Sequence, residues 1–169
     1  ATADDGSCIV PETGMTCAGV PELFEYNQST LQAFYLFEEV SIDGAAVDTL
    51  DWVGAFNGDV CVGARMWNTL GCGSGICDLA AMGNDGQSTT VGYMTNGDIP
   101  SFKIYDASEN TYIDAFPSEH FPWSNMAFEL TETLTSYPNW QDDPGAYEFT
   151  ATIVGGIVLS DGNLIAEAG

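Results

Sequence analysis

Residues 51–65 have the sequence DWVGAFNGDVCVGAR, in which two apolar runs flank the dipeptide Asn57-Gly58. Asn-Gly between two such runs is the strongest local signal for a β-hairpin, because a type I′ turn needs positive φ at both central residues. The stretch therefore predicts a tight hairpin whose turn is centred on Asn57 and Gly58. We expect this hairpin to lie at the centre of the folded domain.

Side chains alternate between the two faces of a strand, so the hairpin residues can be assigned to faces. We expect the aromatic residues of the first strand to pack in the core. The residues predicted to share a face are Trp52, Gly54 and Phe56 in the first strand and Val60, Val62 and Ala64 in the second.

Further strands are predicted on both sides of this hairpin. Residues 23–40 are rich in aromatic and apolar side chains and predict one or two long strands, while residues 88–94 predict a shorter one. A second hairpin is predicted from the alternating segments 101–106 and 111–116. Residues 126–134 alternate in the same way and predict the closing strand of a domain.

The segments between these strands predict loops. Residues 68–87 are dense in glycine and predict a long loop, and residues 117–124 predict a shorter loop bracketed by prolines. No segment clearly predicts a helix. With roughly seven to nine strands, the chain is predicted to be an all-β, antiparallel β-sandwich of immunoglobulin-like or jelly-roll type, followed by a C-terminal extension strand.

The domain organisation follows from where these patterns begin and end. We expect an irregular N-terminal leader at residues 1–21, the β-sandwich domain at 22–136, and a linker with a C-terminal strand at 137–169. The last part repeats an earlier arrangement, since an aromatic-Glu-aromatic triplet leads through an apolar run to Asp-Gly in both places. It is therefore either the start of a second copy or a donor strand.

The C-terminal strand carries the functional prediction. A β-branched segment of this kind would drive aggregation as a bare edge, so it needs a sheet to join. Addition to the sheet of a neighbouring copy would propagate as an open, head-to-tail homopolymer. The apolar residues expected in this polymerisation strand are Tyr147, Phe149, Ala151, Ile153, Val154, Ile157 and Leu159.

The charge of the chain excludes several partners. There are 25 Asp and Glu residues but only Arg65 and Lys103 as basic ones, which gives a formal net charge of −23. Nucleic acid and anionic membrane surfaces need clustered basic residues, so neither is expected as a partner. Disorder is excluded because 45% of the residues are hydrophobic and 12% aromatic. We expect folding in a salty or calcium-containing medium that screens the self-repulsion.

The five cysteines favour an oxidising, extracellular setting. Cys72 and Cys77 bound a short flexible loop that a disulfide could close, and Cys8 with Cys17 could clip the N-terminal segment. Cys61 is then left over. The chain has one histidine and no CxxC pair, which argues against zinc. It contains no transmembrane run or apolar signal core, so we expect Ala1 to be a processed, mature end and the protein to be secreted or at the cell surface.

Acidic residues gather around both hairpins and make calcium the expected cofactor, if there is one. Hard cations prefer clustered carboxylate and carbonyl oxygens. The competing explanation is a solvated acidic surface with Asx-turn residues. The calcium candidates are Asp48, Asp51 and Asp59 at the first hairpin and Asp106, Glu109 and Asp114 at the second.

Tryptophans could instead form a platform that stacks on sugars. Trp123 and Trp140 lie in loops beside prolines and are expected to be the better exposed, which makes polysaccharide a possible partner. Catalysis has little support, because His120 is the one histidine and neither a Gly-x-Ser-x-Gly nor a His-Glu-x-x-His motif accompanies it. We therefore expect no enzyme activity. For Lys103 we expect an ordinary ion pair rather than an isopeptide bond.

The hairpin sequence at 51–64, together with GDIPSFKIYD at 97–106, resembles a module of large secreted, multidomain surface proteins of environmental bacteria. The DDGSC leader at residues 4–8 is similar to the end of a short calcium-type repeat in such proteins. The resemblance covers residues 22–134 and implies an extracellular β-sandwich without an enzymatic role. Two functions follow as hypotheses: a filament subunit assembled by strand addition, or a carbohydrate-binding or adhesive module.

Overall fold

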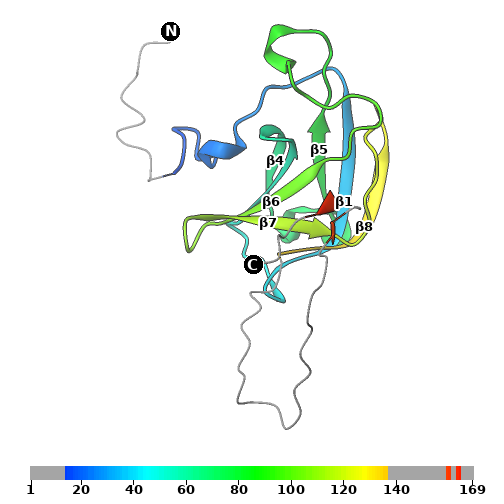
Figure 1. Cartoon of the computed structure of the whole chain (residues 1–169). Helices are drawn as coiled ribbons and strands as arrows, with labels where there is room; N and C mark the ends of the chain where they lie inside the picture. The colour runs from blue at the N-terminus through cyan, green and yellow to red at the C-terminus, as the bar shows by residue number, and fades with distance from the viewer. Residues whose placement is uncertain (1–13, 137–158, 161–162, 165–169) are drawn as a thin grey trace. The chain divides into compact units, whose positions relative to one another are not determined.

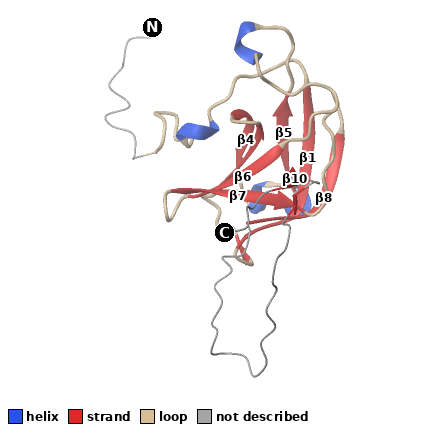
Figure 2. Cartoon of the chain, in the orientation of Figure 1, coloured by secondary structure: helices blue, strands red, loops and turns tan. Residues whose placement is uncertain are grey.

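The computed structural model describes residues 14–136, 159–160 and 163–164. The protein is all-β, and its helical segments are 3₁₀ turns of three residues (Figure 2). This confirms the predicted fold class. The strands are β1 (Gln32–Ile42), β2 (Ala45–Ala46), β3 (Trp52–Asn57), β4 (Val60–Met66), β5 (Cys77–Met82), β6 (Ser101–Asp106), β7 (Thr111–Pro117), β8 (Phe128–Ser136), β9 (Leu159–Ser160) and β10 (Asn163–Leu164).

The chain divides into two compact units, residues 1–138 and 139–169. In the second unit, the described strands β9 and β10 pair antiparallel. The first unit contains a mixed sheet of eight strands, a number within the predicted range.

The large sheet has the order β2-β1-β8-β7-β6-β3-β4. β5 also pairs with β1, on the side away from β8. β7 and β8 pair over three residues only, and there the sheet turns from one layer into another. Figure 1 shows β1, β5 and β8 running together while β6 and β7 cross them. β5 lies against β3 and β4 without pairing with either. The result is a curled sheet that encloses a core as a sandwich does.

One pair of strands departs from the predicted antiparallel arrangement. β1 and β8 run parallel, with Phe34 opposite Phe128 and Leu36 opposite Leu130. A parallel pair needs a long crossover connection. Here all the strands from β2 to β7 lie between the two partners in sequence, so local patterns could not predict the pairing.

The main core lies between the two layers. The ring of Phe102 in β6 makes T-shaped contacts with two rings of β1. Its centroid lies 5.2 Å from that of Phe37 and 5.6 Å from that of Tyr35. Burial of an aromatic side chain of this size contributes about 2 kcal/mol to stability. The other fully buried members include Ala33, Val53, Ala55, Val62, Cys77, Leu79, Ala81, Ile104 and Leu134.

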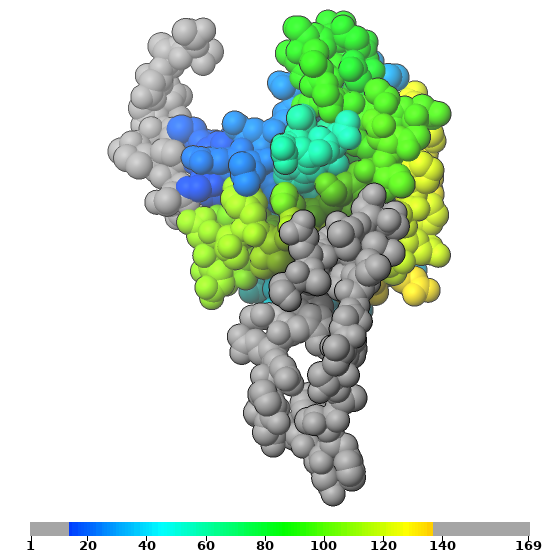
Figure 3. Space-filling view, in the orientation of Figure 1, coloured from blue at the N-terminus to red at the C-terminus, as the bar shows by residue number. Residues whose placement is uncertain are grey.

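A second, smaller core lies on the opposite face of β3, β4 and β6. Phe24 is fully buried there and packs edge-on against Phe56, with ring centroids 5.8 Å apart. A Cβ on Gly54 would lie 2.8 Å from the Phe24 ring, so glycine allows this approach. Figure 3 shows residues 14–26 lying as a blue segment against the β6–β7 hairpin. The predicted shared face of Trp52, Gly54 and Phe56 is confirmed, and it packs under this N-terminal segment.

The described part of the predicted leader, residues 14–21, is tied down by backbone hydrogen bonds. The N–H of Thr16 donates to the carbonyl of Val20, and the N–H of Glu22 donates to that of Gly14. Met15 and Val20 pack against the second core. The end of the leader therefore contributes to the folded domain.

The central hairpin is confirmed, but its turn is one residue further along than predicted. Asn57 pairs with Val60, so Gly58 and Asp59 are the central turn residues. Gly58 has a φ of 59° and Asp59 has no positive φ. Positive φ at the first central position alone is the pattern of a type II′ turn. The predicted type I′ turn is therefore wrong.

A β-bulge also changes the faces of β4. Ala55 pairs with Gly63 whereas Phe56 pairs with Cys61, so β4 has one extra residue between these pairs. An extra residue reverses the alternation beyond it. Val62 packs in the main core while Ala64 packs with the second core. The prediction that Val60, Val62 and Ala64 share one face is therefore wrong.

Two predictions between residues 68 and 94 are also wrong. The expected loop at 68–87 contains β5, which pairs with β1 from Cys77 to Met82. Residues 88–94 were expected to form a strand, but they begin with a 3₁₀ turn and contain no strand. Glycines on both sides of β5 obscured its alternation. In the other segment, the apolar residues Tyr93 and Met94 are buried although they lie in turn structure and not in a strand.

Candidate functional site

The outer face of β1 and β8 exposes apolar side chains. Phe128 is 67% exposed, Leu130 52%, and the neighbouring Met126 58%. Phe34 and Leu36 of β1 lie opposite the two β8 residues and are partly buried. The rings of Phe34 and Phe128 stack, with centroids 4.8 Å apart. We call Phe34, Leu36, Phe128 and Leu130 the apolar patch.

The apolar patch lies beside an open strand edge. β8 pairs with β1 on one side from Phe128 to Thr135, but with β7 on the other side only from Leu134 to Ser136. Within the described part of the chain, residues 128–132 have no ladder partner on that second side. Unpaired backbone groups along a strand are a template for pairing with another strand. Figure 1 shows β8 in yellow at the side of the sheet, next to β1.

The edge of β5, by contrast, is closed. The Arg65 guanidinium of β4 forms an ion pair with the carboxylate of Asp78, and its Nη1 also donates to the Asp78 carbonyl at 3.0 Å. The N–H of Met94 donates to the Met82 carbonyl at 3.3 Å. The Ala80 carbonyl lies over Gly63 of β4, since a Cβ at Gly63 would come within 1.8 Å of its oxygen. These carbonyls are therefore not available to pair with an added strand.

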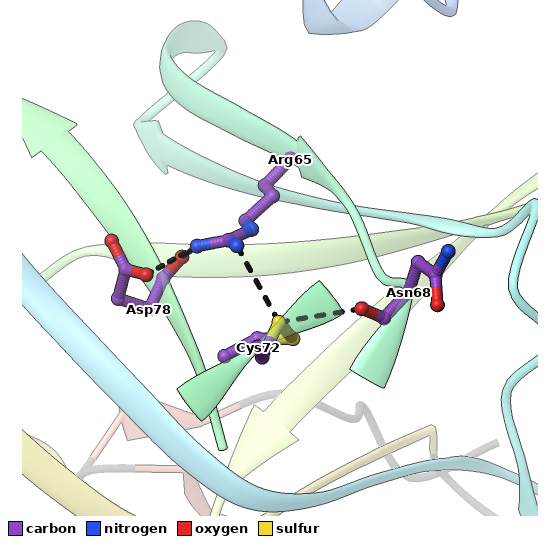
Figure 4. A network of polar contacts seen from close by, with 5 residues as sticks. Arg65, Asn68, Cys72 and Asp78 are labelled. Atoms are coloured by element: carbon purple, nitrogen blue, oxygen red, sulfur yellow. Dashed lines mark hydrogen bonds and ion pairs between the residues drawn. A yellow bond between two sulfur atoms is a disulfide. The ribbon is translucent and has the colours of Figure 1, made fainter. Parts of the chain in front are cut away.

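Arg65 also holds the loop before β5. Its Nη2 donates to the Sγ of Cys72 at 3.4 Å, and that sulfur lies 3.4 Å from the Asn68 carbonyl oxygen (Figure 4). The predicted Cys72–Cys77 disulfide is confirmed. It joins this loop to the first residue of β5. One basic side chain and one disulfide thus fix the covered edge.

The other cysteines differ in state. Cys17 is disulfide-bonded, and its predicted partner Cys8 lies outside the described residues. Cys61 is a free, buried thiol, and burial raises its pKa to about 11. Such a thiol stays protonated at neutral pH and is a poor nucleophile.

Asp51 is buried and holds two turns together. Asp51 is only 4% exposed. Oδ2 accepts the N–H of Asp48 at 2.7 Å, and Oδ1 accepts the N–H of Ala107 in the β6–β7 turn at 2.9 Å. This calcium candidate therefore already uses both oxygens as hydrogen-bond acceptors.

The calcium candidates at the second hairpin are likewise engaged. Asp106 accepts hydrogen bonds from the N–H and hydroxyl of Ser108 and from the N–H of Glu109. Partial burial raises the pKa of Asp106, but the hydrogen bonds from Ser108 and Glu109 outweigh this and leave it lowered. Asp114 pairs with Lys103, the ion pair that the sequence predicted.

The remaining candidates, Asp48, Asp59 and Glu109, are exposed. No three His, Cys, Asp or Glu side chains within the described ranges lie close enough together to hold a metal ion. The structure therefore does not bring the six candidates together. Calcium binding stays a prediction.

Trp123 is not available to stack on a sugar. It is 3% exposed and belongs to the main core, and its Nε1 donates to the Ala81 carbonyl at 3.0 Å. The expectation of an exposed ring is wrong because the loop folds back over β5. A Cβ at Gly83 would lie 2.5 Å from the Trp123 ring, so that glycine makes room for it. Trp140 lies outside the described residues.

The predicted polymerisation strand also falls largely outside them. Leu159 begins the described strand β9. The other six predicted residues of that strand, from Tyr147 to Ile157, lie outside the described part of the chain.

Asp85 is a structural carboxylate that the sequence analysis did not identify. It accepts hydrogen bonds from the N–H and hydroxyl of Thr30, from the hydroxyl of Thr90 at 2.7 Å and from the N–H of Gln87. These bonds, that of the Thr30 N–H first, lower the pKa of Asp85. It ties the segment before β1 to the loop after β5. The Asx-turn sequence Asn-Asp-Gly at 84–86 is the signal that could have indicated it.

We expect this carboxylate to make stability depend on acid. A group with a lowered folded pKa stabilises the fold fully above its unfolded pKa of about 3.9, and this stabilisation is lost as the pH falls toward the folded pKa. Asp85→Asn should lower the thermal midpoint at pH 7, and the difference from the wild type should shrink below about pH 4. Asp59→Asn, in an exposed turn, removes the same charge and is the control. Equal pH profiles for the two variants would contradict the assignment.

Comparison with known proteins adds no relative: no family model matches the chain, and neither curated proteins nor solved structures give a match. Within the described ranges, no helix is long and apolar enough to cross a membrane. The resemblance to a secreted surface module remains an expectation from the sequence. The features of the described domain that bear on function are the apolar patch and the β8 edge.

Proposed function

We propose that the protein is an extracellular structural subunit, assembled into a filament when a C-terminal strand of one copy adds to the sheet of the next. The observation that carries the proposal is an apolar segment that follows a complete sandwich domain in sequence. Residues 149–160 contain no charged side chain in a chain of net charge −23. An apolar β-branched segment is stable in water only when a sheet covers it.

The described domain supports the proposal by offering a place for a strand. β8 has an open edge at residues 128–132, and the apolar patch lies next to it. In strand addition, main-chain hydrogen bonds provide affinity and alternate side chains provide specificity. A contact between different surfaces of identical subunits repeats without closing, so it produces a filament.

The proposed setting is outside the cell, and the proposed role is structural rather than catalytic. The Cys72–Cys77 disulfide is compatible with an oxidising compartment. Salt or calcium in such a medium would screen the repulsion between subunits of charge −23. Trp123 is buried, so it does not support the carbohydrate-binding alternative.

Removal of the C-terminal part tests the function directly. The full chain is expected to form polymers visible by electron microscopy, and deletion of residues 138–169 should leave a soluble monomer, because the added strand is gone. Sedimentation velocity measures both states. Polymers that persist in the truncated protein would overturn the proposal.

A matched pair of substitutions separates loss of the strand from loss of the tail as a whole. Ile153→Asp places a charge in the middle of the apolar segment and should abolish assembly. Ile165→Asp places the same charge in the same tail but beyond the segment, and should leave assembly unchanged. Equal loss in both variants would show that residues 147–159 have no special part.

A further inference from the structure

We infer that the β8 edge at residues 128–132, with the apolar patch beside it, accepts residues 147–159 of a second copy of the chain as an added strand. This inference rests on the proposed function and names its receiving surface.

The β5 and β7 edges of the sheet differ from the β8 edge in what they offer a strand. The β5 edge is covered by Arg65, Gly63 and Met94. The free side of β7, at residues 111–114, carries the exposed Lys103–Asp114 ion pair of the β6–β7 hairpin on its face. Along β8, the unpaired backbone carries Phe128 and Leu130, whose exposed side chains an added strand could cover, while Phe34 and Leu36 extend the apolar patch onto β1.

Charge favours an occupant that presents no acidic side chain to the patch. Two positions beyond the patch on each strand, Glu38 and Glu132 are exposed. Both basic residues of the chain, Arg65 and Lys103, are already in ion pairs, so neither is left to attract an acidic segment. Residues 149–160 have no charge to repel. Alternation would place Tyr147, Phe149, Ala151 and Ile153 together on one face, and Glu148, the one charged residue of the segment 147–159, on the other. That face is the match to the apolar patch.

The linker favours a second copy over the same chain. Ten residues, 137–146, connect the end of β8 to the segment, and fully extended they span about 33 Å. To reach its own β8 edge, the chain would have to reverse within this linker and pass β7, which occupies that side of β8 at residues 134–136. A neighbouring copy presents the same edge without that obstacle.

Leu130→Asp in the full chain is the test. Leu130 is half-exposed, so the variant should keep its thermal midpoint, while a carboxylate on the patch should raise the concentration for half-assembly at least tenfold. Leu70→Asp is the matched control, because Leu70 is 89% exposed in a 3₁₀ turn and carries the same change. Hydrogen exchange of the amides at 128–132, followed against protein concentration, gives the second readout.

We expect wild type and Leu70→Asp to assemble with concentration-dependent protection of residues 128–132. At the concentrations where they assemble, Leu130→Asp should stay monomeric and lack that protection. Assembly of all three proteins with no protection at 128–132 would overturn the inference and leave the proposed function standing. A wild type that stays monomeric at every concentration would overturn both. Protection in that monomer would mean that the segment folds onto its own chain.

Discussion

Gly63→Ala is expected to lower the free energy of unfolding by about 3 kcal/mol, the upper end of the range for overpacking a core. The ideal Cβ would lie 1.8 Å from the carbonyl oxygen of Ala80 and 2.9 Å from its carbonyl carbon. Both are backbone atoms of β5, so no side-chain rotation relieves the clash. β4 and β5 would have to separate, and the core between the two layers would lose its packing.

Urea denaturation measures this loss, and thermal melting should show a fall of about 10 °C. Gly71→Ala is the control, because a Cβ there meets no atom within 4 Å and its φ is not positive. That variant should stay within about 0.5 kcal/mol of the wild type. Similar midpoints for the two variants would contradict the close contact between β4 and β5.

Asp51→Ala is expected to cost about 3 kcal/mol, because it leaves two backbone donors without their acceptor. The carboxylate joins the N–H of Asp48 to the N–H of Ala107, and both hydrogen bonds are lost once the oxygens are gone. A hydrogen bond to a charged group contributes about 1.5–3 kcal/mol, and an unsatisfied buried donor costs about as much. Asp51→Asn keeps one oxygen and should lose about half of that stability.

Asp114→Ala provides the matched control for Asp51→Ala. It removes the same charge, but its ion pair with Lys103 is on the surface, with the Asp114 side chain 67% exposed. Exposed ion pairs contribute about 0–1 kcal/mol. The urea midpoint should therefore be highest for wild type, lower for Asp114→Ala and lowest for Asp51→Ala. Equal losses at the two positions would contradict a structural role for Asp51.

The Asp51 result bears on what the candidate calcium residues do. Their acidity and their position beside two hairpins suggested a cation site, yet Asp51 and Asp106 use their oxygens to hold turns through backbone amides. Sequence shows that a carboxylate is near a turn. Only the fold shows whether its oxygens point to an amide, as they do for Asp85 as well.

The candidate site could be predicted only in part. Residues 126–134 gave the correct strand apart from its ends, and their alternation placed Phe128 and Leu130 on one face. Alternation does not say which face is buried, and here Thr131 is buried while both apolar residues are exposed. Trp123 shows the converse, since a proline-rich loop suggested exposure but the ring lies in the core.

By itself, the sequence determined the all-β class, both hairpins and the Cys72–Cys77 disulfide, because period-two alternation, turn residues and short loops act between neighbours in the chain. Only the tertiary structure decided that β1 lies parallel to β8 and that β8 keeps an open edge. It also decided that β5 forms a strand whose outer edge is covered at Arg65 and Gly63. The physical reason is that burial and strand pairing depend on partners distant in sequence. No local pattern specifies which strand comes to lie beside another.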